Sequence, residues 1–455
     1  MTPLPRKEKM AQTPLLTQGL RGFSEETVRE LSRLKEEPAW LRQRRLDAWE
    51  VCQATPMPTL QDEDWRRTDI REIPFDNLLP YSQPSRTGGE LPRELRPLLD
   101  LGKAHAGHLI QEDSEVVFAS LGEAASGDGV IFVPLDEAVH QHQDLAKQVL
   151  LGEGFPASRG KFAALNAALF SGGAFLYVPK DVEVVLPLQA TRWLSSQGVA
   201  VFPHTVVIME AGAKATLIEE YYSAPLAGPS LVCPGIEVYL RPGAQLRHIS
   251  IQQLARSAYV LGTHRALLER DSRLDYLAVA VGGRLTKAYT DVVLQGDGAH
   301  ARLLGLVFGD GEQHFDHQTL QEHIGVNASS DLLFKVVVKD NAMSVHYGTV
   351  RVHKGARGTD AGQAVRNLIL SAGAKAHPIL PLEIEASDIR RCSHAAAIGQ
   401  IDENQLFYLQ SRGFTRRQAE KLVVDGFFEP VMAAIPLEGV QERLRRAIDS
   451  KLPGD

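Results

Sequence analysis

The most constraining feature of this sequence is a pattern of strands and turns that recurs from about residue 172 to about residue 385. Short runs rich in Val, Ile, Leu and Tyr alternate with polar residues at the period of a β-strand, and Gly, Asp and Asn turns separate them. Four turns, EAGAK, RPGAQ, ERDSR and QGDGA, have expected apices at Gly212, Gly243, Asp271 and Asp297. These apices lie 31, 28 and 26 residues apart.

This regular spacing predicts stacked units, because a single pair of strands cannot bury its own apolar face. Weaker turns lie between the main ones, and the series continues to about Gly355. No helical pattern of ten or more residues separates the strands, so a sheet with helical crossovers is not expected. We predict a β-solenoid, and an irregular sandwich with chance turn spacing remains the alternative.

The flanking regions have helical patterns. Residues 1–165 are expected to form a largely helical N-terminal region, with Ser24 capping a first helix and a break at Pro38. This region includes an irregular connector to about residue 97, two strand-like runs at 115–119 and 130–133, and a helical stretch at 135–151. Residues 166–386 would then form the solenoid core, and residues 387–455 a helical module.

The C-terminal module has its own start and stop signals. Asp402 with Gln405, and Thr415 with Gln418, have the spacing of capping boxes, and Gly413 stands where a glycine ends a helix. We expect a break at Pro430 and a last short helix at 440–448.

Composition excludes several classes of protein. A net charge of -7 gives no general attraction to nucleic acid or to anionic membranes. No run approaches eighteen apolar residues, and the first residues lack the pattern of a signal peptide, so we expect a soluble cytoplasmic protein. Cys52, Cys233 and Cys392 are far apart and odd in number, which is consistent with a reducing compartment. The sequence contains no phosphate-binding loop, no nucleophile elbow and no Cys-x-x-Cys pair.

Two groups of residues could bind a metal. Cys392 and His394 are two positions apart, so on a strand both would face one side, and thiolate with imidazole suits iron or zinc. On this segment alone, a half-buried cysteine beside a capping histidine is the stronger interpretation. His314, His317 and His323, with Asp316, form the densest histidine cluster. The strand period divides this cluster between two faces, so a metal site there is the weaker prediction.

Three stretches together resemble the SufB/SufD family of iron–sulfur cluster assembly proteins. The most specific is RCSHAAAIGQIDENQLFYLQSRG at 391–413. Upstream, the histidine cluster, KVVVKD at 335–340, GTDA at 358–361 and NLILS at 367–371 follow the family's order. PAWLR at 38–42 and DWRRTD at 64–69 are similar to the helical start of the SufD branch.

The resemblance implies a right-handed parallel β-helix with flanking helical regions and a non-catalytic function. It implies pairing with a SufB-like scaffold through the β-helix and binding of a SufC-like ATPase, whose ATP-driven movement would rearrange the scaffold pair. Cys392 and His394 would lie at the scaffold interface, with His394 assisting iron acquisition or cluster assembly. Contacts with the ATPase would come from the C-terminal module. Its expected apolar anchors are Phe407, Tyr408, Phe427 and Phe428.

Within the family, the sequence resembles the SufD branch more closely. The SufB branch has a cysteine in a late strand, whereas no cysteine lies between Cys233 and Cys392 here. We therefore expect no stably bound cofactor, only iron or a cluster held transiently with the scaffold, and possible self-pairing of the chain alone. The alternatives are a SufB-like scaffold and a β-helix enzyme acting on carbohydrate. The latter requires paired acids on one face, which the sequence does not show.

Overall fold

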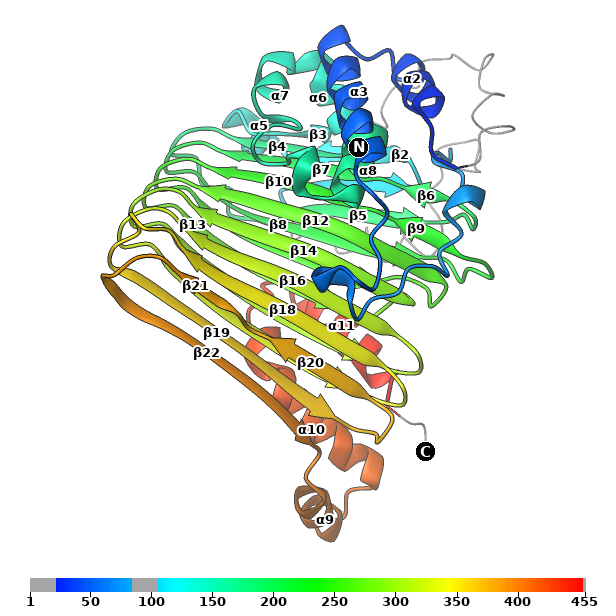
Figure 1. Ribbon diagram of the computed structural model, residues 1–455, viewed down its shortest axis with the longest axis vertical. Helices are drawn as coiled ribbons and strands as arrows, with labels where there is room; N and C mark the ends of the chain where they lie inside the picture. Colours follow the sequence, from blue (N-terminus) through cyan, green and yellow to red (C-terminus); the bar gives the residue numbers. More distant parts are fainter. Residues whose placement is uncertain (1–21, 84–104, 453–455) are drawn as a thin grey trace.

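The computed structural model describes residues 22–83 and 105–452 of the chain, and most of these residues lie in two long sheets (Figure 1). Through most of the solenoid, the chain alternates between the two sheets from one strand to the next. Among the described strands, pairing is parallel except between β1 (Gly107–Glu112) and β2 (Glu115–Leu121), and between β3 (Ile131–Pro134) and β4 (Gly173–Val178). The predicted parallel β-solenoid is confirmed.

The two sheets have ten and twelve described strands. In spatial order the ten-stranded sheet contains β2, β1, β5 (Leu188–Leu194), β8 (Lys214–Ser223), β11 (Gln245–Gln253), β13 (Arg273–Ala280), β15 (His300–Gly309), β17 (Ser329–Val338), β19 (Thr359–Ile369) and β22 (Ile389–Gln400). The main path of the twelve-stranded sheet contains β20 (Lys375–Ile379), β18 (Met343–Val352), β16 (His314–His323), β14 (Leu285–Leu294), β12 (Ala258–Leu268), β10 (Gly235–Leu240), β7 (His204–Met209), β4 and β3. Beside this path, β21 (Leu382–Ile384) pairs with β18, and β9 (Ser230–Val232) pairs with β6 (Ala200–Val201) and β12.

The turns on one side of the solenoid stack on one another. Gly212, Gly243 and Asp271 have positive φ angles of 71°, 70° and 56°, as predicted apices of tight turns should. Each donates its backbone N–H to a carbonyl of the next coil, as in the 2.9 Å bond from Asp271 to Asp297. The next apex is Gly298 (φ 71°), one residue beyond the expected Asp297. Stacked turns of nearly equal length thus keep successive coils in register.

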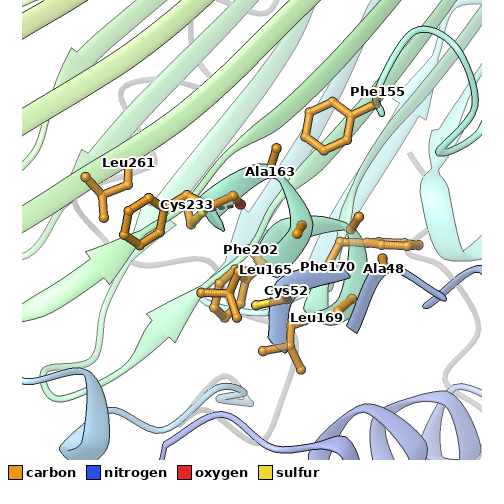
Figure 2. Close-up of a cluster of buried hydrophobic side chains, with 14 of the residues drawn as sticks. Ala48, Cys52, Phe155, Ala163, Leu165, Leu169, Phe170, Phe202, Cys233 and Leu261 are labelled. Carbon is orange, nitrogen blue, oxygen red and sulfur yellow. Dashed lines mark hydrogen bonds between the residues drawn. The ribbon is translucent and has the colours of Figure 1, made fainter. Parts of the chain in front are cut away.

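The N-terminal helices cover the outer face of the twelve-stranded sheet (Figure 1). They are α2 (Glu25–Leu34), α3 (Ala39–Ala54), α6 (Leu135–Gln141), α7 (Gln143–Val149) and α8 (Lys161–Leu169). The short helix α5 (Glu123–Gly127) instead packs Ala125 against interior side chains of the solenoid. Figure 2 shows the apolar cluster beneath α3 and α8, with Cys52, Cys233 and Phe202 in it. Arg45 of α3 is fully buried because its guanidinium pairs with Glu37 and donates to two carbonyls at the end of α8.

Three C-terminal helices follow the last strand: α9 (Glu403–Ser411), α10 (Arg416–Met432) and α11 (Glu438–Asp449). Apolar residues of α10 and α11 pack against the outer face of the ten-stranded sheet. Polar bonds hold α11 and the residues after it in place: the Arg443 guanidinium donates to the buried carboxylate of Glu220, and Lys451 Nζ lies 2.5 Å from Asp310 Oδ1. The strands in the middle of the solenoid are therefore buried on both faces.

Most helix signals behave as expected. The Ser24 hydroxyl accepts from Thr27 N, and Thr415 and Gln418 form a complete capping box. Asp402 caps α9 through Asn404 N, without the reciprocal bond expected from Gln405. The break expected at Pro430 is wrong, because α10 continues to Met432. Burial of Phe428, Val431 and Met432 against the solenoid outweighs the one backbone bond that Pro430 cannot make.

The expected segments are subdivided differently in the described residues. Three strands of the expected N-terminal region, β1, β2 and β3, are part of the two sheets. Of these, β2 and β3 match the strand-like runs expected at 115–119 and 130–133. The expected helical module at 387–455 begins with a strand, β22, which belongs to the ten-stranded sheet, and its first helix begins at Glu403. Part of the expected connector, residues 84–97, lies outside the described residues.

Candidate functional site

The last strand of the ten-stranded sheet, β22, ends the solenoid on an open edge. It is 12 residues long and pairs with β19 on one side; among the described residues no strand pairs with its other side. Most of its residues are exposed. Figure 1 shows β22 along the lower edge of the solenoid, leading into α9. An unpaired edge of this length presents a row of backbone donors and acceptors to another chain.

Cys392 and His394 lie on this strand and face the same side, as the two-residue spacing predicts. In the register with β19, Cys392 stands beside Ala361 and His394 beside Gln363. Ala361 and Gln363 are buried at alternating positions that continue to Val365 in the solenoid core. Both site residues therefore project toward the interior side of the last coil, where no further described coil covers them.

The imidazole of His394 is oriented by a backbone carbonyl of the opposite sheet. Nδ1 lies 2.5 Å from the carbonyl oxygen of Leu380, in the short break between β20 and β21. A carbonyl oxygen can only accept a hydrogen bond, so Nδ1 carries the proton. Nε2 then presents a lone pair, and no described residue hydrogen-bonds to it. His394 is thus prepared to act as a metal ligand or proton acceptor through Nε2.

The thiol of Cys392 has a different environment. It packs at the margin of an apolar cluster formed by Val350, Val352, Ala356, Ala361 and Ala386. Burial raises the pKa of the Cys392 thiol, because the thiolate is poorly solvated there. At neutral pH the thiol is therefore protonated, and ligation of a metal requires loss of that proton.

The structure does not bring the histidine cluster together. His314 and Asp316 face outward, where both contact the Thr68 hydroxyl, and His314 Nε2 lies 3.0 Å from its oxygen. His317 and His323 face the interior, and His323 Nε2 lies 2.8 Å from Ser330 Oγ. Burial lowers the pKa of each of the three histidines to about 4. The division between two faces follows the strand period, so the arrangement gives no support to the weaker prediction of a metal site here.

No group of three or more His, Cys, Asp or Glu side chains among the described residues is placed to hold a metal ion. The pair Cys392 and His394 can supply two ligands at most. A tetrahedral or octahedral metal centre needs further ligands. If the β22 edge holds iron, the remaining ligands must come from another chain or from the group bound together with the iron.

The C-terminal aromatic residues divide into two kinds. On α9, Phe407 and Tyr408 are 71% and 56% exposed. On α10, Phe427 is half-buried beneath Lys335, whose Nζ lies 4.4 Å from the ring centroid. Phe428 is only 1% exposed and packs against Phe308. The Phe428 side chain therefore holds α10 on the solenoid, and of the four expected anchors it offers the least surface to a partner.

Two features of the site were missed by sequence reasoning. The Leu380 carbonyl that orients His394 is a main-chain group, for which a sequence gives no signal. Gln363, beside His394, lies 31 residues earlier in the chain, which is one of the coil lengths between turn apices, so the repeat contained the signal.

Comparison with known proteins gives consistent results. Residues 192–427 match the family model described as SUF system FeS cluster assembly, SufBD core domain. A SufBD family iron–sulfur cluster assembly protein of Staphylococcus saprophyticus is 32% identical over 445 residues, covering 95% of this chain and 94% of the relative. The iron–sulfur cluster assembly protein SufB of Bacillus subtilis is 31% identical with the same coverage. Among the described residues, no helix combines the length and apolar character needed to cross a membrane.

Proposed function

Because the chain belongs to the SufBD family of iron–sulfur cluster assembly proteins, we propose that it is a SufD-like, non-catalytic subunit of a Suf assembly complex. In this proposal it pairs with a SufB-like scaffold, binds a SufC-like ATPase and helps to acquire iron for the cluster. Iron and the growing cluster are cargo, shared with the scaffold, and the chain holds no resident cofactor.

The observation that carries the proposal is the position of His394. Its imidazole is oriented by Leu380, presents Nε2, and stands on an edge strand with an unpaired side in the described chain. A site with one available imidazole and one protonated thiol is incomplete. Pairing along β22 would bring the missing ligands from the scaffold.

The absence of other suitable cysteines favours the SufD-like function over a scaffold function. Cys233 is 1% exposed, its thiol donates to the Phe162 carbonyl, and burial raises its pKa. Cys52 is also buried with a raised pKa. No cysteine lies on the strands between β10 and β22. A chain of this kind lacks the thiolates to hold a cluster alone.

A SufB-like scaffold is the second candidate. It is favoured by the 31% identity to a relative named SufB. The two candidates differ in one measurable property, because a scaffold should retain a cluster without a second family member, whereas a SufD-like subunit should not.

The ATPase contact is proposed for α9. Phe407 and Tyr408 form an exposed aromatic surface there, and α9 projects beyond the solenoid (Figure 1). Exposed aromatic residues on a projecting helix are typical of protein contacts. The sequence has no phosphate-binding loop, so ATP hydrolysis would belong to the partner.

A reconstitution experiment tests the proposal. The chain, a SufB-like protein and a SufC-like protein from the same source are co-expressed in all combinations, and iron and acid-labile sulfide are measured in each purified product. The proposal predicts clusters only when the scaffold is present, and more cluster when this chain accompanies it. A cluster retained by this chain with the ATPase alone would favour the scaffold candidate.

A further inference from the structure

Gln363, on β19, is a buried amide without hydrogen-bond partners. Its side chain is 3% exposed, and neither Nε2 nor Oε1 has a partner among the described residues. Buried amide groups are nearly always hydrogen-bonded, because an unpaired donor or acceptor loses its bonds to water without replacement. A side chain with both ends unpaired therefore requires an explanation.

Gln363 lies at the candidate site. It is the register neighbour of His394 on the adjacent parallel strand, and the two side chains face the same side. Neighbouring strands are about 4.8 Å apart. No described strand follows β22 in this sheet, so the amide lies one strand from the end of the solenoid.

The opposite sheet leaves space for this amide. A Cβ atom on Gly348 would lie 2.7 Å from Gln363 Oε1 and 3.1 Å from a methyl carbon of Leu380. Leu380 is also the residue whose carbonyl orients His394. One wall of the last two coils is thus formed by Gly348, Gln363, Leu380 and His394.

A purely structural role does not account for the amide. Gln321, another buried interior glutamine, donates from Nε2 to Ser330 Oγ at 2.6 Å. Asn367, further along β19, donates to the Ala397 carbonyl. In contrast, the Gln363 amide makes no hydrogen bond, so replacing it with a leucine of similar size would remove none.

We propose that Gln363 is a second binding residue of the His394 site, and that its amide N–H donates a hydrogen bond to a sulfur atom of the cluster assembled there. This inference rests on the proposed function. Cluster sulfides are hydrogen-bond acceptors, and a cluster bound at His394 would lie beside the strand that carries Gln363. Hydrogen bonds to cluster sulfurs stabilise the reduced state and raise the reduction potential.

Gln363→Leu in the co-expressed complex tests the inference. We expect unchanged subunit composition and an unchanged or higher melting temperature, because an unpaired amide is replaced by an apolar group. Cluster formation should slow roughly two- to tenfold, the loss expected for one hydrogen bond. The remaining cluster should have a more negative reduction potential, which a structural role would not change.

Three further variants make the outcomes decisive. His394→Ala tests the proposed site, Gln321→Leu is the control for removing an interior glutamine, and Gln363→Met is a second apolar variant. Wild-type cluster content and potential in a folded Gln363→Leu or Gln363→Met complex, with loss in His394→Ala, would overturn the inference and leave the proposed function intact. Loss of folding in both apolar variants would assign Gln363 a structural role and overturn it too. Wild-type behaviour of His394→Ala would contradict the proposed site itself.

Discussion

His394 on the last strand of the ten-stranded sheet donates from Nδ1 to the carbonyl of Leu380, 2.5 Å away, at the break between β20 and β21 of the other sheet. This bond joins the two sheets at the end of the solenoid. It fixes the tautomer of the imidazole and leaves Nε2 as the ring nitrogen with an available lone pair.

Two substitutions of His394 distinguish its hydrogen bond to the Leu380 carbonyl from its proposed role as a ligand. His394→Asn keeps a side-chain donor near the Leu380 carbonyl but lacks an imidazole lone pair, and His394→Ala removes both. We expect cluster formation to be lost in both variants. The free energy of unfolding should fall by at most about 1 kcal/mol, because only one partly exposed hydrogen bond is affected. Cluster absorbance and urea unfolding provide the measurements; full cluster formation in the Asn variant would show that Nε2 is not used.

The buried pair formed by Lys287 and Asp316 should be essential for stability. Lys287 Nζ lies 2.6 Å from Asp316 Oδ2, and the side chains are 0% and 1% exposed. Asp316→Ala leaves the buried ammonium without its counter-ion, with the Asp64 carbonyl as its remaining acceptor, so the free energy of unfolding should fall by about 3–5 kcal/mol. Urea denaturation measures this loss. Glu183→Ala, which removes an exposed carboxylate paired with Lys214, is the control and should change stability by less than about 1 kcal/mol. Equal effects of the two variants would contradict the prediction.

Acid should destabilise the solenoid before most carboxylates are protonated. Burial lowers the pKa of His317 and His323 to about 4, against about 6.5 in an unfolded chain. Between pH 6.5 and pH 4 the unfolded state therefore binds protons that the folded state does not, and stability falls as the pH falls. Each histidine contributes up to about 3 kcal/mol over this window.

The histidine contribution is measured by the pH dependence of urea unfolding. We expect His323→Gln, which keeps a side-chain amide near Ser330, to show a smaller loss of stability between pH 7 and pH 5 than the wild-type chain. Above pH 7 the two proteins should have parallel profiles. Parallel profiles throughout the acid range would show that His323 is not buried in its neutral form.

The two kinds of C-terminal aromatic residue should respond differently to substitution. Phe407→Ser changes an exposed residue, so it should weaken ATPase binding and leave the free energy of unfolding within about 0.5 kcal/mol. Phe428→Ala empties a buried position beside Phe308 and should cost about 3–5 kcal/mol. Calorimetric titration with the ATPase and urea unfolding measure the two effects. Unchanged ATPase affinity of Phe407→Ser would remove α9 from the proposed interface.

Local periodicity predicted much of this fold. The turn residues Gly212, Gly243 and Asp271 were correctly placed because a left-handed turn requires particular residue types. The period of two also predicted that His314 and His317 would face opposite sides, and that Cys392 and His394 would face one side.

Features that depend on distant contacts could not be predicted in this way. The continuation of α10 past Pro430 and the burial of Phe428 both follow from packing against the solenoid. Likewise, the orientation of His394 depends on a backbone carbonyl that only the closed coil brings near. The resemblance to a family indicated that the segment 391–413 is important. It did not indicate which of its side-chain atoms are available to a ligand.

The composition of the purified complex tests the central claim most directly. The chain is tagged and co-expressed with its SufB-like and SufC-like partners, and the native mass of the purified product is measured. The account predicts a complex of this chain with one scaffold and two ATPase subunits, one bound to each member of the scaffold pair. Recovery of this chain alone, or only as pairs of itself, would contradict the proposed function.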